Sequence, residues 1–352
     1  MPIVKNYAIW NNKGGVGKST ISYHIATRYA ERNPNEDVLV IDMCPQANIS
    51  MMLLGGGNGD QNVLNKINTI PSQTVVGYMG EELANHNPSA SSYAVQVCQD
   101  NPNMPSNLYL LCGDGTLDLM APVLQYYSSQ PSTSPTQIDS WMRVRLLLKG
   151  FVDKFVMEKQ DRNITVFIDT NPAFSIYTEI AISAAERLIC PVNADDSSRI
   201  AASALMTLLH PAITPHPLYS QYSYAAKAVH NGLNVPCIHL VVGNRMTQYA
   251  GAAAAFRAMS NATTGILYSS YVNNPRYFTP RNTTILSEND FIKGYSHLLR
   301  DFNTTGVVTV HQGQLLSRMQ QGRYQVHGND VQLKNDRITE CLQSVDELID
   351  KL

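Results

Sequence analysis

The residues best suited to chemistry lie near the amino terminus, in the run Lys13-Gly14-Gly15-Val16-Gly17-Lys18-Ser19-Thr20. Glycines in such a loop let backbone N–H groups turn inward and approach phosphate oxygens closely. A helix that begins there adds partial positive charge. Lys18 would reach the β- and γ-phosphates of a nucleotide, and the Ser19 hydroxyl would ligate Mg²⁺. We therefore predict a nucleotide-phosphate site formed by residues 14–20.

Two aspartates follow apolar runs that are typical of buried strands. Asp42 follows Val38–Ile41, and Asp169 follows Ile164–Ile168. An open α/β sheet binds its ligands at the carboxyl ends of its strands. We interpret Asp169 as the carboxylate that holds the water shell of a nucleotide-bound Mg²⁺.

These side chains require a parallel sheet to position them. The succession of apolar run, glycine turn, helix and second apolar run over residues 4–42 is typical of a βαβ unit. Further buried strands are predicted at Leu108–Leu111, Ile164–Ile168, Leu188–Val192 and Ile238–Val242. We predict an α/β fold, a single P-loop NTPase domain over residues 1–352 with a mostly parallel twisted sheet flanked by helices. The segments 53–106 and 211–236 are interpreted as insertions or long loops, and residues 288–352 as a mainly helical extension.

The glycine loop departs from the plain phosphate-loop pattern in one way. Asn12 stands where the first glycine is expected, and Lys13 follows it. The sequence here resembles the deviant Walker A ATPases of the ParA/MinD family, and the ParA-type partition ATPases most of all. That resemblance implies that Lys13 reaches across a homodimer interface to the partner's ATP, where it acts as an arginine finger does. The resemblance covers residues 1–50 closely and continues as ordered islands to residue 250.

The family's later motifs supply further expected roles. Asp42 matches the carboxylate that positions the attacking water, so that Lys13, Lys18, Asp42 and Asp169 would form the catalytic set, with Ser19, Asp42 and Asp169 at the metal. Cys44 replaces the aspartate expected two residues after Asp42, which leaves one carboxylate for that task. Pro191 resembles part of the family's next strand. Asn244, followed by Arg245, resembles the residue that reads the adenine edge, where an amide can pair with a donor and an acceptor.

The same resemblance implies a function and partners. The expected activity is slow hydrolysis of ATP with Mg²⁺ by a protein that forms a homodimer in the ATP state. Such a dimer binds DNA without sequence preference, and a ParB-like or adaptor protein on the cargo stimulates hydrolysis. The cytoplasm, with association to the nucleoid, is the expected location.

The composition allows this interpretation but hides an asymmetry. Lys and Arg number 26, Asp and Glu number 28, and charged residues are only 15% of the 352; about 25% is usual. Residues 51–140 hold seven carboxylates and one cation, whereas residues 197–287 hold six cations and no carboxylate. Non-specific DNA binding needs cations that face phosphates. The candidates are Arg257, Arg276, Arg281, Arg300, Arg318 and Arg323.

Two other functions are alternatives to partition. A MinD-like membrane-associated positioning ATPase would use a carboxyl-terminal amphipathic helix, and residues 338–352 carry an apolar stripe. Its polar face is rich in carboxylates, which anionic lipid repels, so packing on the chain's own core is the preferred interpretation and membrane binding is not expected. An iron–sulfur carrier would need its cysteines to converge. The six cysteines are scattered without a CxxC pair, which favours free thiols in a reducing cytosol.

Overall fold

The main sheet is the element that positions every candidate residue. The computed structural model describes residues 2–131, 139–193, 195–210, 222–246 and 263–352. Within these ranges eight strands form one sheet in the order β3-β4-β2-β5-β1-β6-β7-β8. The strands are β1 Val4–Ile9, β2 Asp37–Met43, β3 Val95–Gln96, β4 Leu108–Leu111, β5 Ile164–Thr170, β6 Arg187–Asn193, β7 Cys237–Met246 and β8 Ser296–Arg300. All neighbours are parallel except β3 and β4, so the predicted mostly parallel sheet is confirmed.

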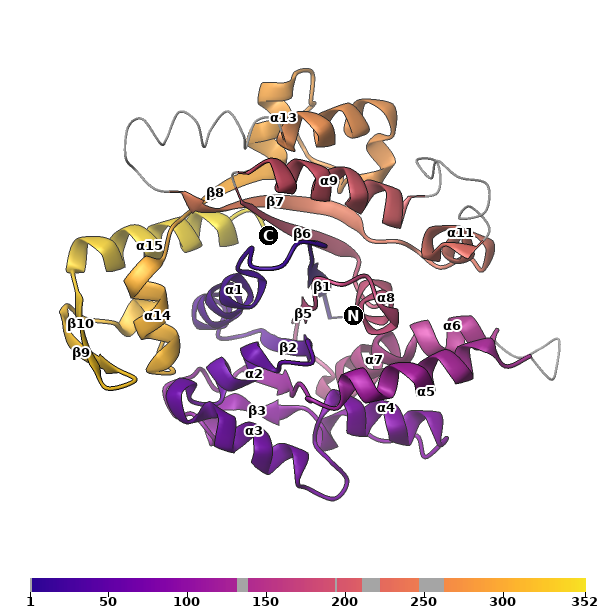
Figure 1. Ribbon diagram of the computed structural model, residues 1–352, viewed down its shortest axis with the longest axis horizontal. Coiled ribbons are helices and arrows are strands. Elements are labelled where there is room, and N and C mark those ends of the chain that lie inside the picture. The colour runs from indigo at the N-terminus through magenta and orange to yellow at the C-terminus, as the bar shows by residue number, and fades with distance from the viewer. Residues whose placement is uncertain (1, 132–138, 194, 211–221, 247–262) are drawn as a thin grey trace.

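Helices cover both faces of this sheet (Figure 1). The helices that begin and end within the described ranges are α1 Lys18–Arg32, α2 Asn48–Leu53, α3 Gly59–Ile67, α4 Val75–Leu83, α5 Leu117–Ser129, α6 Ser140–Arg145, α7 Leu147–Lys159, α8 Ile176–Ser183, α9 Asp196–Leu209, α11 Tyr224–His230, α13 Glu288–Tyr295, α14 Asn303–His311 and α15 Asn335–Ile349. Residues 263–273 are also helical. One hydrophobic core lies between the sheet and α1, α2, α14 and α15, and a second lies against α4 to α9. Because both faces are covered, β2 and β5 are buried at every position.

The segment 53–106 is largely structured, unlike a long loop. It contains α3, α4, three short 3₁₀ turns and the edge strand β3. The hydroxyl of Thr74 caps α4 by accepting the Gly77 N–H at 3.2 Å. Apolar side chains such as Val75 and Met79 are fully buried, which gives the segment a place in the core. Of the segment 211–236, residues 211–221 lie outside the described ranges, and the remainder includes α11.

The carboxyl-terminal part contributes to the sheet as well as to the helical layer. Residues 288–352 contain α13, α14 and α15, but β8 extends the main sheet beyond β7. A separate hairpin of β9 Gly322–Val326 and β10 Asn329–Leu333 packs beside α14 (Figure 1). The helical extension is therefore an incomplete description, because β8 pairs with the strand that carries Asn244.

Candidate functional site

The glycine loop leaves β1 and enters α1 with the backbone geometry that the sequence predicted. Gly15 has φ +71° and Gly17 has φ +82°, a region that glycine enters without strain. A Cβ atom on Gly17 would lie 2.3 Å from the side-chain nitrogen of Asn244. Asn244 Nδ2 donates to the Val16 carbonyl at 2.9 Å. The end of β7 is thus bonded to the middle of the loop, and only glycine fits at position 17.

Lys18 lies inside the loop it closes. Its Nζ donates to the Lys13 carbonyl at 2.9 Å and to the Asn11 carbonyl at 3.2 Å. The residue is 7% exposed, and burial lowers the pKa of its ammonium to about 8, although Asp169 opposes this shift. A buried cation bonded only to neutral carbonyls gains strongly from an incoming phosphate.

Two serines on α1 bring its first turn to the end of β5. Ser19 Oγ donates to Asp169 at 2.6 Å, and Ser22 Oγ donates to the other oxygen of that carboxylate at 2.9 Å. Asp169 is fully buried. The hydroxyl and the carboxylate that the sequence assigned to a metal therefore lie in direct contact.

A second buried carboxylate stands beside the first. Asp42 and Asp169 are paired in the register of β2 and β5. Asp42 accepts the Ser50 N–H and hydroxyl at 3.1 and 2.7 Å and the Cys44 N–H at 3.0 Å. Burial raises the pKa of both carboxyls, and for Asp42 the charge of Asp169 raises it further. Two adjacent buried carboxylates, with one lysine nearby, form a place where a divalent cation relieves repulsion.

Cys44 lies next to this pair but cannot replace a carboxylate. Its thiol is 6% exposed. Burial, followed by the charge of Asp42, raises its pKa to about 12. The thiol is therefore neutral at physiological pH, and Asp42 alone supplies the carboxylate on this loop.

Lys13 forms an ion pair within its own chain. Its Nζ contacts Oδ2 of Asp195, which precedes α9. The other oxygen of Asp195 caps α9 by accepting the Ser198 N–H at 2.8 Å. Side-chain exposure is 22% for Lys13 and 41% for Asp195. The lysine thus sits at the protein surface, held by a partner that solvent already reaches.

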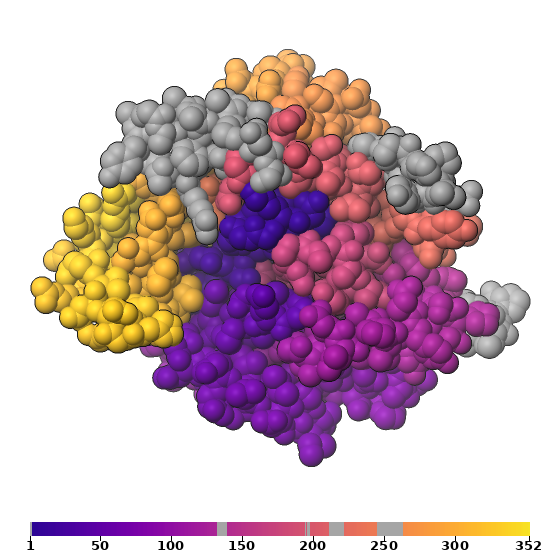
Figure 2. Space-filling model, viewed as in Figure 1, coloured from indigo at the N-terminus to yellow at the C-terminus, as the bar shows by residue number. Residues whose placement is uncertain are grey.

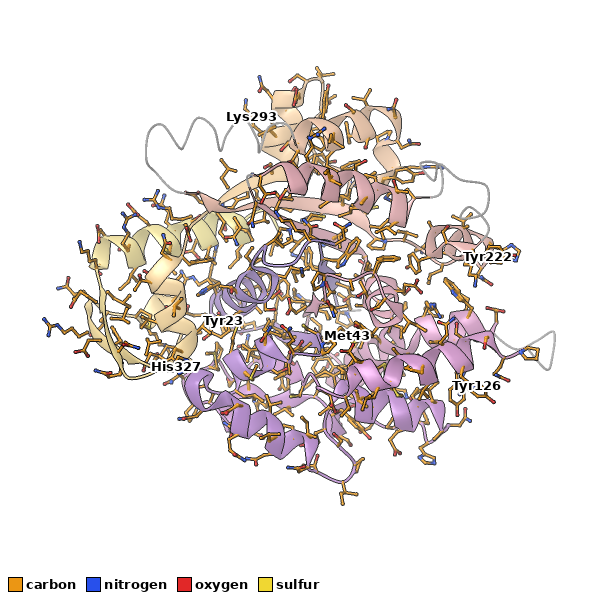
Figure 3. The ribbon with its side chains drawn as sticks, in the orientation of Figure 1. Tyr23, Met43, Tyr126, Tyr222, Lys293 and His327 are labelled. Atoms are coloured by element: carbon orange, nitrogen blue, oxygen red, sulfur yellow. The ribbon has the colours of Figure 1, made fainter. Side chains whose placement is uncertain are left out.

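A cavity of about 540 Å³ opens next to the loop. It is lined by Gly17, Thr20, Met52, Asn244, Asp301, Phe302, Asn303, Gly306, Val307 and Val310. Figure 2 shows this face, where the indigo amino-terminal segment reaches the surface beside the orange carboxyl-terminal part. In Figure 3, the buried side chain of Met43 at the end of β2 is labelled near the centre of the view, with that of Tyr23 of α1 to its left. Asn244 therefore faces a space where a base could lie next to the phosphate loop.

The other residues expected at the nucleotide have different surroundings. The Pro191 carbonyl accepts the Asn11 side-chain N–H at 2.6 Å, which fixes the start of the glycine loop to β6. Arg245 lies in β7, but its side chain is outside the described part. Pro191 thus positions the glycine loop through its backbone carbonyl.

The six arginines proposed for DNA do not share one surface. Arg300 is ion-paired with Glu340 at 2.6 Å, and its side chain is 13% exposed. Arg318 and Arg323 are exposed on the part that carries the hairpin. Arg276 and Arg281 lie near the starts of β6 and β7 instead, where Cys237 Sγ contacts the Arg276 carbonyl and Arg281 contacts that of His239. Arg257 is outside the described residues.

The apolar stripe of α15 is packed on the chain's own core, as predicted. Ile338, Cys341, Val345, Leu348 and Ile349 are buried against α1 and the sheet. On the polar face, Asp346 pairs with Arg28 at 2.7 Å and Asp350 with Arg32 at 2.7 Å. No helix in the described ranges combines the length and apolar character needed to span a bilayer.

The described residues also bear on the iron–sulfur alternative. All six cysteines are free thiols. Nowhere in the described part do three or more His, Cys, Asp or Glu side chains gather as metal ligands.

Sequence reasoning missed several residues that hold the site together. Ser22 follows Ser19 by three residues on one helix face, a spacing that could have indicated a second bond to Asp169. Asp195 precedes Ser198 in a helix-capping pattern, but nothing in the sequence connects it to Lys13. Asn11 and Ser50 carry no recognisable signal, since their partners lie on other strands or loops.

Comparisons with known proteins agree with the fold. A family model described as the CobQ/CobB/MinD/ParA nucleotide binding domain matches residues 7–335. A Cyanothece McdA variant solved with ATP is 16% identical, with a TM-score of 0.60 over 99% of this chain and 98% of that one. The pnob8 ParA is 16% identical, with a TM-score of 0.52 over 84% and 81%. A plasmid partition protein of Borrelia burgdorferi B31 bound to AMPPNP is also 16% identical, with a TM-score of 0.51 over 100% of both chains. At this identity the likenesses show the fold. No curated protein matched the chain.

Proposed function

The chain belongs to the CobQ/CobB/MinD/ParA nucleotide-binding family, and from this premise we propose an ATP-dependent dimerising ATPase of the partition type. It positions or segregates DNA or another large cargo. Its ATP dimer binds DNA without sequence preference, and a ParB-like or adaptor protein stimulates hydrolysis. The observation that carries the proposal is the pair of lysines on one loop, with Lys18 inside it and Lys13 at the surface.

ATP fits the site through its phosphates and its base. The glycine loop supplies inward N–H groups and Lys18 supplies a charge for the phosphates. The cavity lined by Gly17, Thr20 and Asn244 is adjacent and large enough for an adenosine. Structures with similar folds were solved with ATP and with AMPPNP, which supports this ligand.

The two buried aspartates and Ser19 fit Mg²⁺. This ion prefers oxygen ligands. The single positive charge of Lys18 does not neutralise both Asp42 and Asp169, whose mutual repulsion a divalent cation would reduce. When bound, Mg²⁺ would neutralise charge on the β- and γ-phosphates. Asp42, fixed by Ser50 and by the Cys44 N–H, would orient the attacking water. With Cys44 neutral and a single carboxylate on this loop, the expected intrinsic rate is slow.

Lys13 would act in trans once it leaves Asp195. In a dimer that joins two glycine-loop faces, its ammonium would meet the partner's ATP and stabilise charge that develops at the transferred phosphoryl group. This would make hydrolysis dependent on dimer formation.

The helix that a membrane-associated function would need is packed within the protein. The apolar face of α15 is buried in the core, and its polar face is tied to α1 through Asp346 and Asp350. Release of α15 would expose this face and break both ion pairs. The structure therefore favours the partition-type proposal.

The test separates the two lysines. Wild-type protein with ATP and Mg²⁺ should sediment as a dimer and bind a random-sequence DNA duplex. Lys18→Ala should lose ATP binding, because its charge is the loop's only buried cation partner for phosphate. Lys13→Ala should keep ATP binding but remain a monomer. A Lys13→Ala protein that dimerises with ATP as wild type does would refute the role in trans.

A further inference from the structure

A group of cations gathers where several strands of the main sheet begin, at the end of β1 opposite the glycine loop. We name it the strand-edge cluster, and it consists of Lys5, Arg187, Arg281 and Lys351. Lys5 and Arg187 lie at the starts of β1 and β6, while the glycine loop follows the other end of β1. Arg281 reaches the start of β7, where its guanidinium donates to the His239 carbonyl. Lys351 follows α15 and donates to the Ser296 carbonyl at the start of β8 at 2.7 Å.

These four cations have none of the carboxylate partners that half of the other described lysines and arginines have. Among the described residues, none of the four lies within ion-pair distance of an aspartate or glutamate. Their hydrogen-bond and ring neighbours are mostly neutral: Arg187 donates to the Tyr7 hydroxyl at 3.0 Å, and Arg281 lies over the Tyr295 ring at 4.7 Å. The Tyr7 hydroxyl donates in turn to an oxygen of Leu352, the last residue of the sequence, at 2.6 Å. All four are partly exposed, so solvent and ligands reach them.

The cluster carries the signs of unrelieved positive charge. Burial lowers the pKa of Arg281 and Lys351, and the charge of Arg187 lowers the first while that of Arg281 lowers the second. Glu186 and Glu347 are the carboxylates that act electrostatically on this region, both from exposed positions. Arg281 Nε is buried without a hydrogen-bond partner, as is Nδ1 of His239, a residue only 3% exposed. Folding holds these groups together although they repel one another.

The spatial arrangement suits a linear polyanion. The strands β1, β6 and β7 are neighbours in the sheet, about 4.8 Å apart. Lys5, Arg187 and Arg281 therefore place charge in a row where these strands begin, and Lys351, which follows α15, extends the row. A DNA strand carries one negative charge about every 3.4 Å along its axis. An anionic membrane suits this edge less well, because the apolar stripe of α15 is buried and cannot insert into lipid.

We propose that the strand-edge cluster is the surface that binds the phosphate backbone of DNA. This inference rests on the proposed function, since it names the face that the DNA-bound ATP dimer would use. The cluster is separated from the glycine loop by the length of β1, about 20 Å for its six residues. DNA at this edge leaves the glycine-loop face free for a second copy of the chain. Arg281 is already a DNA candidate from the sequence, whereas Lys5, Arg187 and Lys351 come next to it only through the fold.

The experiment is a salt titration of DNA affinity with the full chain, ATP and Mg²⁺. Each phosphate contact contributes a slope of about 0.9 to log K against log salt, or roughly tenfold in affinity at 0.1 M salt. Lys5→Gln and Lys351→Gln should each lower the slope by about 0.9, and the double variant by about 1.8. Lys5→Arg, which keeps the positive charge, should have the wild-type slope. Lys334→Gln, an exposed cation at the other end of α15, is the matched control and should leave the slope unchanged. Melting temperatures establish that each variant is folded.

The outcomes separate this inference from the proposed function. If wild type binds DNA and the Lys5 and Lys351 variants keep its slope, the strand-edge cluster is not the DNA surface, while the partition-type function stands. If the wild-type ATP dimer does not bind DNA at all, both are overturned. Binding to phosphatidylserine vesicles that is lost in Lys5→Gln, with DNA affinity unchanged, would replace DNA by lipid as the occupant.

Discussion

Asp195→Asn should strengthen dimer formation in the ATP state. Lys13 is held in its own chain by Asp195, yet its proposed role needs it at the partner's nucleotide. Asparagine removes the charge but keeps the side-chain oxygen that caps α9 through the Ser198 N–H. Asparagine and aspartate are comparable helix caps, so the helix should remain intact.

The size of the effect follows from the exposure of the pair. Side chains that are 22% and 41% exposed make a pair screened by water, and such pairs contribute about 0.5–1 kcal/mol. Two pairs break when a symmetric dimer forms, which gives about 1–2 kcal/mol against association. Their removal should therefore tighten the dimer dissociation constant by about 5- to 30-fold.

Sedimentation velocity over a concentration series, with ATP and Mg²⁺, measures this constant directly. Asp153→Asn is the control, because Asp153 forms a similar surface pair with Lys149 at 2.7 Å on α7. It should leave the dimer constant unchanged. High salt should shrink the difference between Asp195→Asn and wild type, since screening already weakens the pair. A dimer dissociation constant for Asp195→Asn that equals or exceeds the wild-type value would show that the ion pair does not oppose dimer formation.

Three further predictions concern the buried groups. Because burial lowers the pKa of Lys18 to about 8 while bound phosphate favours its charged form, ATP affinity should fall as pH rises above that value; a pH-independent titration with fluorescent ATP would contradict this. Asp42→Ala should slow phosphate release and lengthen the life of the ATP dimer, which a turnover assay beside gel filtration would measure. His24 is fully buried with neither ring nitrogen bonded, and burial lowers its pKa to about 3. The unfolded chain, with a histidine pKa of about 6.5, takes up a proton first as pH falls, so wild type loses stability below pH 6.5. Urea unfolding should show His24→Leu losing about 2 kcal/mol less than wild type between pH 6.5 and 5.

The sequence predicted the centre of the fold well because that centre is built from local signals. Short apolar runs before polar or glycine turns gave β1, β2, β4, β5, β6 and β7. A parallel sheet buried on both faces needs such continuous apolar strands, so the pattern is strong. The pairing of Asp42 with Asp169 follows from the same rule, since both aspartates end neighbouring strands.

The edges of the fold escaped prediction for the opposite reason. β8, with the sequence Ser296-His-Leu-Leu-Arg300, is an edge strand that needs few apolar residues, and its Leu298 is 45% exposed. β3 has only two residues. In the segment 53–106, buried residues such as Val63 and Val75 are spaced among glycines and asparagines, so composition suggested loops where tertiary contacts form α3 and α4.

The candidate site divides in the same way. Residues 13–20 form the loop that their sequence predicts, because turn and helix are local properties. The contacts that hold the site in place are long-range: Lys13 with Asp195, Ser50 with Asp42, and Asn244 with the Val16 carbonyl. Spacing along the chain contains no information on such pairs. The site chemistry was therefore accessible from sequence, while its resting state needed coordinates.

The uneven distribution of charge along the sequence is best understood from which cations form ion pairs in the fold. The stretch 197–287 has six cations and no carboxylate, yet the cations within it are spread over several elements. In the described residues, Arg28, Arg32, Arg145, Arg162 and Arg300 all pair with carboxylates from distant parts of the chain. In a chain with few charges, a cation left unpaired in a partly buried place costs stability, because desolvation and repulsion are not offset. Lys18 is such a cation where β1 ends, and Lys5, Arg187, Arg281 and Lys351 are such cations at the opposite end of the strands. A nucleotide phosphate would offset this cost at Lys18, and DNA phosphates would offset it at the strand-edge cluster for the same physical reason.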